Sequence, residues 1–128
     1  MGLSLEIVLL EIRNFIAMDY FENFEGAVTI SDLKGTIIYM NEKAISTFEK
    51  DGGRGLIGKN LEDCHKERSN EIIRQILSTK KKNVYTIEKN GKKKLIFQAP
   101  WYKGFELSGL VELSLEIPFE MAHFNRDL

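Results

Sequence analysis

Cysteine, proline and histidine are all scarce in this sequence of 128 residues. The single cysteine, Cys64, excludes an intramolecular disulfide and with it a disulfide-stapled secreted framework. Two prolines and the lack of a Ser/Gly-rich tract argue against long disordered linkers. The only imidazoles are His65 and His123, and the sequence has no Ser-His-Asp order, H-E-x-x-H motif or P-loop. We therefore expect one domain that is not an enzyme.

An excess of charge of one sign is also lacking, because 18 basic residues are balanced by 19 acidic ones. Without a basic footprint, we expect no nucleic-acid partner, and the lysine runs at 80–82 and 92–94 fit solvated surfaces. No unbroken apolar run is longer than four residues, the length of Ile7–Leu10, and this is far shorter than the roughly 20 residues of a membrane-spanning helix. The start of the chain does not have the pattern of a signal peptide, so a cytoplasmic location is expected.

The first half of the chain combines helical and strand patterns. Apolar spacing predicts an amphipathic helix over residues 3–18, whose stripe must cover the chain's own sheet, a second copy, or both. Two β-rich stretches, Ala27–Ile30 and Thr36–Met40, lie around a turn. Asn41 is placed to cap a helix over residues 42–50.

The second half begins with a helix that Ser69 is expected to cap and that runs to about Thr79. Asn90-Gly91 is a strong hairpin signal between two strands. A last strand, Leu107–Ile117, alternates strictly and ends at Pro118. The order of these elements predicts an α+β fold with an antiparallel sheet.

Several stretches in this order resemble a PAS domain. They are "VTISDLKGTIIYMNEKAISTF", "LIGKNLEDCH" with its G-[KR]-x-[LF] step, "KNGKKKLIFQAPWY" and "GLVELSLEI". The resemblance implies a five-stranded antiparallel sheet flanked by short helices, one longer helix and an N-terminal amphipathic flanking helix. It divides the chain into a flanking or dimerisation helix (1–23), a PAS core (24–118) and a C-terminal tail (119–128). The adjacent Cys64 and His65 also resemble a bacterial PAS subgroup with a CHP..S-type segment, although Lys66 replaces its proline.

The stretch around residues 53–58 also contains a literal G-x-G-x-x-G, at Gly53, Gly55 and Gly58. A dinucleotide-binding loop needs a strand before these glycines and a helix after them. A predicted helix precedes them instead, so we interpret the glycines as part of a connector.

The resemblance implies a sensory or interaction module that holds a ligand between the sheet and the helices. It further implies signalling to a partner protein through the flanking helix, and a homodimer. The expected dimer residues are Leu5, Leu9, Ile12 and Ile16. The candidate ligand-binding residues are Phe48, Cys64, His65, Ile73, Leu77, Thr86, Gln98, Glu112 and Ser114.

The last strand leaves open which of its two rows lines the cavity. One row is polar and contains Glu112, Ser114 and Glu116, whereas the other is aliphatic. If the N-terminal helix covers the aliphatic row, the polar row faces the ligand. A carboxylate inside a cavity is costly unless it is paired. Glu112 there would indicate either a ligand with an amine or a raised pKa of its own carboxyl group.

The sequence does not identify a cofactor. Haem-binding members of the family usually take their axial histidine from the longer helix, which has none here. The resemblance therefore leaves His65, just before that helix, as the candidate axial ligand of a haem. Flavin is not expected, since Leu61 stands where the "G-R-N-C" motif of flavin-binding light sensors has its cysteine. A four-ligand zinc site is not available within one chain, and no metal is expected. The alternatives to a ligand sensor are a scaffold whose own Phe, Ile and Leu side chains fill the cavity, or a redox sensor using Cys64. The ordinary interpretation makes Cys64 a small buried hydrophobe and His65 a partner of the backbone.

Overall fold

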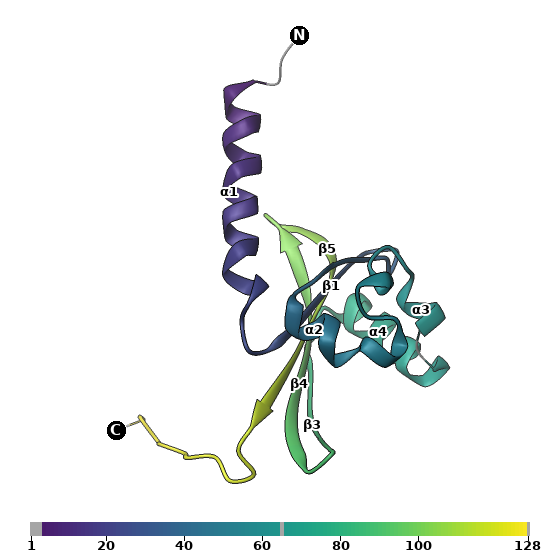
Figure 1. Ribbon diagram of the computed structural model, residues 1–128, viewed down its shortest axis with the longest axis vertical. Coiled ribbons are helices and arrows are strands. Elements are labelled where there is room, and N and C mark those ends of the chain that lie inside the picture. The colour runs from purple at the N-terminus through teal and green to yellow at the C-terminus, as the bar shows by residue number, and fades with distance from the viewer. Residues whose placement is uncertain (1–3, 65, 128) are drawn as a thin grey trace.

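The computed structural model describes residues 4–64 and 66–127, without the side chains of Glu11, residues 13–18 and Cys64. It forms a five-stranded antiparallel sheet in the order β2-β1-β5-β4-β3 with short helices and one longer helix of the core, which confirms the predicted α+β fold (Figure 1). The elements are α1 (Leu5–Glu22), β1 (Ala27–Asp32), β2 (Ile37–Met40), α2 (Glu42–Thr47), the 3-10 helices η1 (Glu49–Asp51) and η2 (Gly53–Leu56), α3 (Leu61–Cys64), α4 (Glu67–Thr79), β3 (Asn83–Lys89), β4 (Lys92–Lys103) and β5 (Glu106–Ile117).

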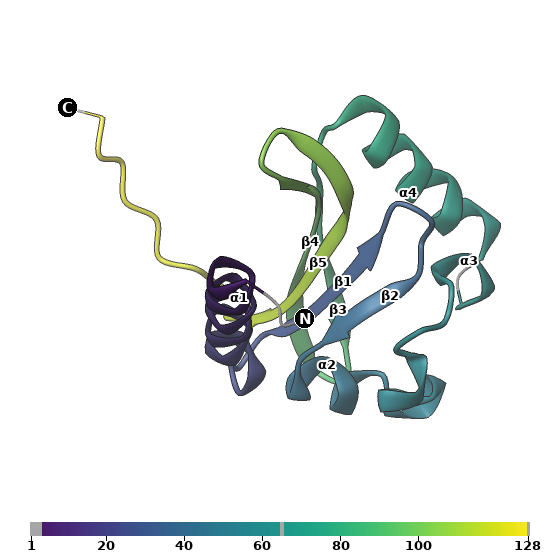
Figure 2. The ribbon, with the colours of Figure 1, turned by 90° about the horizontal axis from the view of Figure 1, so that it is seen from above.

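The helices lie on both sides of the sheet. Figure 2 shows α3 and α4 on one side and α1 on the other. We call the side covered by α3 and α4 the inner face and the opposite side the outer face. The core lies between the inner face and the helices, and its buried members are Ala27, Ile37, Met40, Ala44, Leu56, Leu61, Ile76 and Leu110.

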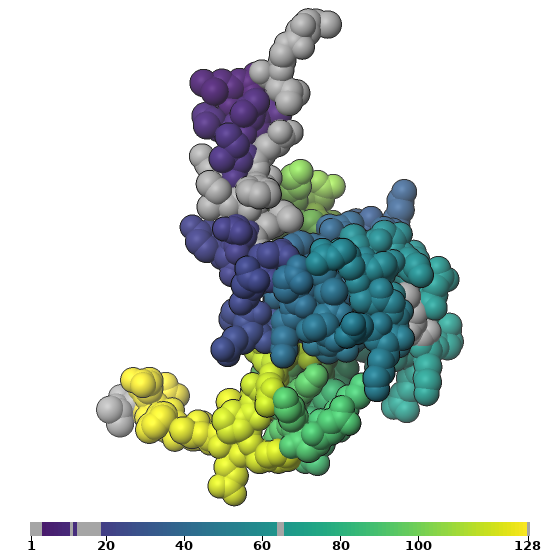
Figure 3. Space-filling model, in the orientation of Figure 1, coloured from purple at the N-terminus to yellow at the C-terminus, as the bar shows by residue number. Residues whose placement is uncertain are grey.

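The N-terminal helix is longer than predicted and stands clear of the domain. It runs to Glu22 instead of ending near Met18. Figure 3 shows its purple first turns projecting beyond the sheet. Leu5, Leu9 and Ile12 are exposed there, whereas the side chain of Ile16 lies outside the described residues. The apolar stripe is therefore not covered by the chain's own sheet at these three positions.

Two other helix boundaries differ from the prediction. The longer helix begins at Glu67, and its N-cap is Lys66, which makes no side-chain cap hydrogen bond. The predicted cap at Ser69 was therefore wrong, since Asn70 N–H already bonds to the Lys66 carbonyl. The helix predicted over residues 42–50 ends at Thr47 and continues as a 3-10 turn. The cap at Asn41 is confirmed, because its Oδ1 accepts a hydrogen bond from Ala44 N–H at 2.9 Å.

Tyr39 ties the end of α1 to β2, and this contact makes stability depend on pH. Its hydroxyl donates to Glu22 Oε2 at 3.1 Å. Burial, followed by the hydrogen bond and charge of Glu22, raises the pKa of Tyr39 to about 12. The unfolded chain loses this proton near pH 10, at about the ordinary tyrosine pKa. The group's contribution to stability is therefore present below about pH 10 and is lost as the pH rises to about 12.

We expect the free energy of unfolding of the wild type to fall more steeply over this window than that of Tyr39→Phe. Denaturant unfolding at a series of pH values measures both slopes. Tyr102→Phe, which removes a more exposed phenol, is the matched control and should follow the wild type. Equal slopes for Tyr39→Phe and the wild type would contradict the role assigned to this contact.

Candidate functional site

One row of residues crosses the whole sheet on its inner face. From β2 to β3 it consists of Met40, Thr29, Glu112, Gln98 and Asn83, each directly opposite the next. Opposed residues in antiparallel strands share a face and lie about 5 Å apart. Met40 and Thr29 are buried, so the row begins in the core, and every member after Met40 is polar. The register of the sheet thus brings four polar side chains together beneath the helices.

Hydrogen bonds join the last three members of this row. Gln98 Nε2 donates to Glu112 Oε1 at 2.8 Å, and Asn83 Nδ2 donates to Gln98 Oε1 at 3.0 Å. Gln98 is only 7% exposed, and its amide is held from both ends. These bonds give the half-buried carboxylate of Glu112 a donor inside the protein, which offsets the hydration that partial burial removes. A carboxylate can accept several hydrogen bonds, so Glu112 can also serve a further donor.

A small cavity lies beside this polar row. Its floor is formed by sheet residues, including Thr29, Ser31 and Glu112, and its roof by Leu61 of α3 and Ile73 of α4. Its volume is about 10 Å³, roughly the room that one water molecule needs. Small-molecule pockets are typically about 300–1,000 Å³. The cavity therefore has polar chemistry but no room for a larger molecule in this conformation.

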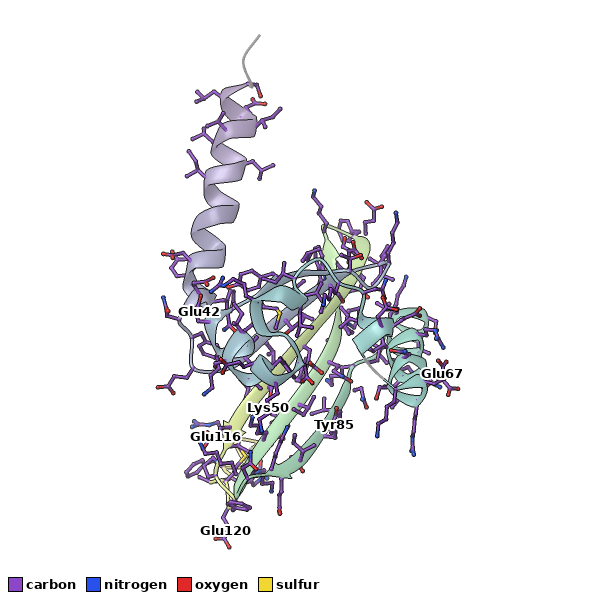
Figure 4. The ribbon with its side chains drawn as sticks, turned by 45° about the vertical axis from the view of Figure 1, so that its right-hand side comes forward. Glu42, Lys50, Glu67, Tyr85, Glu116 and Glu120 are labelled. Carbon is purple, nitrogen blue, oxygen red and sulfur yellow. The ribbon has the colours of Figure 1, made fainter. Side chains whose placement is uncertain are left out.

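Tyr85 stands at the rim of the same face, on β3 (Figure 4). It opposes Ile96, one of the buried residues of β4. The pKa of Tyr85 is raised, first by burial and then by the negative charge of Glu112. The negative charge of Glu112 therefore acts on Tyr85 as well as on Gln98, its hydrogen-bonded partner.

The structure brings three of the sequence-predicted residues together at the cavity: Ile73, Gln98 and Glu112. Ser114 opposes Ala27 and Ile96, so it lies on the inner face one step along β5. Phe48 and Leu77 pack against the hydrophobic core instead of lining the cavity.

Thr86 does not belong to this group. It opposes Leu95, which in turn opposes Leu115, so Thr86 lies on the outer face and is exposed. Successive strand residues point to opposite faces, and the register places Tyr85, not Thr86, on the inner face. His65 and the side chain of Cys64 lie outside the described residues. The ligand, haem and redox roles considered for them therefore stay predictions.

Sequence reasoning missed Thr29, Ser31 and Asn83. A local signal existed for the first two, because Thr29 and Ser31 share one face of a strand whose alternate residues include Val28 and Ile30. Asn83 had no such signal, since only the pairing of β3 with β4 places it next to Gln98.

The glycine motif forms no phosphate site of the dinucleotide-binding kind. α2 and the turn η1 precede Gly53, and the segment Gly53–Leu56 is itself a 3-10 turn. The strand-loop-helix arrangement that such a site needs is therefore missing from this part of the described chain. Among the residues with described side chains, no group of three or more His, Cys, Asp or Glu is arranged to hold a metal ion.

Comparison with known proteins agrees with this architecture. The PAS domain family profile matches residues 25–99, whereas no curated protein sequence matches the chain. The PAS domain of a protein from Colwellia psychrerythraea is similar at 19% identity and a TM-score of 0.58, over 85% of this chain and 97% of that one.

Two further solved structures have the same fold. The PAS domain of an HTR-like protein from Haloarcula marismortui matches at 14% identity and a TM-score of 0.58, over 88% of this chain and 98% of that one. The Aer2 receptor from Vibrio cholerae, described as a dual PAS-heme oxygen sensor, matches at 15% identity and a TM-score of 0.54, over 73% of this chain and 95% of that one. At such identities the likeness concerns the fold alone.

The family assignment rests on sequence and structure together. The profile match spans more than half of the 128 residues and includes four of the five strands in whole or in part. In the described part of the chain, none of the helices has the length and apolar character needed to cross a membrane. The observed sheet is the five-stranded antiparallel sheet that the quoted motifs predict. The chain therefore belongs to the PAS domain family.

Proposed function

We propose that this chain is a sensory module that binds a small polar molecule at the row formed by Thr29, Glu112, Gln98 and Asn83. The observation that carries the proposal is the hydrogen-bonded chain from Asn83 to Glu112 on the buried face of the sheet. An apolar core would be satisfied by apolar side chains at these positions, because buried polar groups are expensive unless they are paired. The module acts by binding and not by catalysis. Sensor proteins among its structural relatives, including a sensory box sensor histidine kinase from Vibrio cholerae, support this class of function.

The site favours a ligand that donates hydrogen bonds, such as a small amine, amide or alcohol. Glu112 offers a carboxylate, and the hydroxyls of Thr29 and Ser31 can donate or accept. Entry requires the roof residues Leu61 and Ile73 to move away, because the present space is about 10 Å³. Binding therefore selects a conformation in which α3 and α4 are displaced from the sheet.

Native mass spectrometry of the purified protein, with a visible absorption spectrum of the same sample, tests this proposal. We expect a small molecule bound to the wild type and a lower occupancy in Glu112→Gln, with affinity reduced by about tenfold, or 1.4 kcal/mol. Glu116→Gln is the matched control, because Glu116 lies on the same strand but is exposed and paired with Lys92. A wild type without any bound molecule would contradict the ligand proposal. A haem or flavin absorption band would instead identify a cofactor.

The second candidate is a ligand-free interaction scaffold, and the size of the cavity favours it. A space that accommodates one water molecule needs no ligand to fill it. In this alternative the row from Asn83 to Glu112 fixes the register of β3, β4 and β5. The same mass spectrum separates the two functions, because the scaffold carries no bound molecule.

We further propose that the module is a homodimer that uses α1. Apolar residues are exposed on several sides of this helix, at Leu5, Ile7, Leu9, Leu10 and Ile12. Exposed apolar surface of this extent on a helix is normally covered by another element or by a partner. A second copy of α1 can cover these side chains, and a partner protein could read the packing of α1 when a ligand displaces α3 and α4.

The double variant Leu9→Asp with Ile12→Asp is expected to be a monomer where the wild type is a dimer. The added carboxylates would be buried without partners in the dimer contact. Light scattering of both proteins at one concentration measures the difference. Leu33→Asp, a change of an exposed apolar residue in the turn after β1, is the control and should remain dimeric. A monomeric wild type would contradict the proposed dimer.

A further inference from the structure

The apolar alternation of β5 continues beyond the residue at which the strand ends. The strand ends at Ile117, but the pattern of Leu113, Leu115 and Ile117 runs on through Phe119 and Met121. The residues between them are serine, glutamate, proline and glutamate. Alternation of this kind is typical of a strand with one covered face. Residues 118–121 thus have the sequence of a strand, while the described structure places no strand beside them.

The last three residues of β5 are paired on one side only. β1 begins at Ala27, opposite Ser114, whereas β4 continues opposite Leu115–Ile117. On the β1 side, the connector Asn23–Gly26 leads to α1 (Figure 1). Its buried Gly26 lies against the Leu115 side chain, but no described strand pairs with β5 there. An unpaired strand edge presents backbone N–H and C=O groups to which an extended segment can add.

A groove of about 1200 Å³ runs along this free edge. Phe24, Leu115 and Ile117 supply its apolar surface, and α2 contributes Glu42 and Lys43. Figure 3 shows the hollow between the dark-blue end of α1 and the yellow tail, and Figure 4 labels Glu42 and Glu116 on its two sides. The groove thus combines an open strand edge with an apolar surface, as an alternating extended segment requires.

The chain's own tail does not occupy this groove. It leads away from the domain (Figures 1 and 2), and Phe119, Met121 and Phe124 are 54%, 60% and 74% exposed. Lys93 Nζ, on β4, donates to the Phe119 carbonyl at 3.5 Å. Because the tail continues β5 directly, it could reach the free edge only by a tight reversal after Pro118. The residues that follow, Phe-Glu-Met-Ala-His, include none of the glycine, asparagine or aspartate that favour such a turn.

We propose that two copies of this chain pair the ends of their β5 strands and their tails with each other, antiparallel, about a two-fold axis near Pro118. The tail of each copy then adds as a strand to the free edge Leu115–Ile117 of the other. Phe119 and Met121 thereby meet the apolar surface of the partner's groove. The contact is self-complementary, as a two-fold interface must be.

Pro118 is compatible with this contact and limits it. Proline has no N–H, so its nitrogen must point away from the partner strand, which restricts the possible registers. The same missing donor hinders the addition of further strands. This tail contact goes beyond the helix contact proposed above. The two contacts act together in one dimer, so the loss of either weakens it, and the tail contact does not depend on a ligand.

A cysteine scan tests the proposed pairing. In a Cys64→Ser background, single cysteines are introduced from Glu116→Cys to Ala122→Cys, and each protein is oxidised. A disulfide needs Cα atoms about 4.4–6.8 Å apart, and in a two-fold antiparallel pair only residues beside the axis meet their own counterparts at that range. We expect covalent dimer at one or two neighbouring positions near Pro118, with a yield about tenfold above that of the exposed α4 control Ser78→Cys. A flat profile, or yields equal to that of Ser78→Cys, would overturn the proposal.

Charged tail variants separate this contact from the α1 contact. Phe119→Asp with Met121→Asp should raise the dimer Kd by about 100-fold, because two apolar anchors are replaced by carboxylates. Ala122 alternates with the apolar row and so points to the other face of the strand. The dimer Kd of Ala122→Asp should therefore stay within about threefold of that of the wild type. If the dimer is lost with Leu9→Asp and Ile12→Asp but kept with the tail double variant, α1 is the interface and the tail pairing is wrong.

Discussion

Replacing Asn41 with alanine is expected to lower the free energy of unfolding by about 3–5 kcal/mol. Asn41 is 0% exposed. Its Oδ1 accepts from Val28 N–H and Ala44 N–H, both at 2.9 Å. Its Nδ2 donates to the carbonyls of Phe21 at 2.9 Å and Gly26 at 2.8 Å. Alanine would remove a helix cap worth about 1 kcal/mol and leave buried backbone groups that each cost about 1–3 kcal/mol when unpaired.

The four bonds of Asn41 have different functions, and a second variant separates them. Asn41→Asp keeps acceptors for Val28 and Ala44 but turns a carboxylate toward the carbonyls of Phe21 and Gly26. We expect it to loosen α1 while α2 remains capped. Hydrogen exchange of the α1 and α2 amides measures the two effects separately. Equal loss of protection in both helices would contradict this division.

Asn60→Ala is the matched control for both variants. Asn60 also joins distant segments, donating to the Lys34 carbonyl and accepting from Glu62 N–H, but it is only half-buried. Water can replace these partners, so we expect a loss near 1 kcal/mol. If Asn41→Ala lowered the free energy of unfolding no more than Asn60→Ala, the central role assigned to Asn41 would be wrong.

Asn41 also links the proposed site to the flanking helix. It bonds to the end of α1 at Phe21 and to β1 at Val28. β1 carries Thr29 and Ser31, which line the cavity. A displacement of β1 caused by ligand binding would therefore reach α1 through one side chain. This path explains why we expect a partner protein to bind α1 and respond to a change in its position.

The elements that could be predicted are those set by local chemistry. Asn90 and Gly91 have φ values of 53° and 74°, the left-handed conformations that an Asn-Gly hairpin turn requires. The alternation of Leu107–Ile117 is visible in the letters alone, and the strand is confirmed. Its register places the polar residues Glu112 and Ser114 on the inner face, so the aliphatic row lies on the outer face. The start of α4 was missed because Ser69 is a favoured capping residue, although the helix begins before it without a side-chain cap.

The candidate site was only partly predictable, because it depends on register. Asn83 and Gln98 are 15 residues apart in the sequence, and Gln98 and Glu112 are 14 apart, yet strand pairing places all three in one row. Thr86 was chosen on the same local grounds as Gln98, but the register places it opposite Leu95 on the outer face. A slip of one residue would exchange the two faces. The volume of the cavity depends on how Leu61 and Ile73 pack over the sheet, which the strand pattern does not encode.

Replacing Gly109 with alanine is expected to destabilise the domain by about 3 kcal/mol or more. Gly109 opposes Asp32 of β1 and has φ = 154°, a conformation that other residues rarely adopt. A Cβ atom there would overlap the Ser31 carbonyl oxygen and lie 2.7 Å from Trp101 Nε1. These two atoms form a hydrogen bond of 2.9 Å across the sheet. Alanine would therefore have to push β1 and β5 apart and break that bond.

Two other glycines separate backbone strain from steric overlap. Gly104 has φ = 63° with open space around its missing Cβ, so Gly104→Ala should cost about 1 kcal/mol through strain alone. Gly55 has open space and no positive φ, so Gly55→Ala should leave stability within about 0.5 kcal/mol of the wild type. Denaturant unfolding of the three variants should give Gly109→Ala a much lower free energy of unfolding than the other two. If it matched Gly104→Ala, strain alone would explain the effect, and the close approach of β1, β5 and Trp101 at this point would be contradicted.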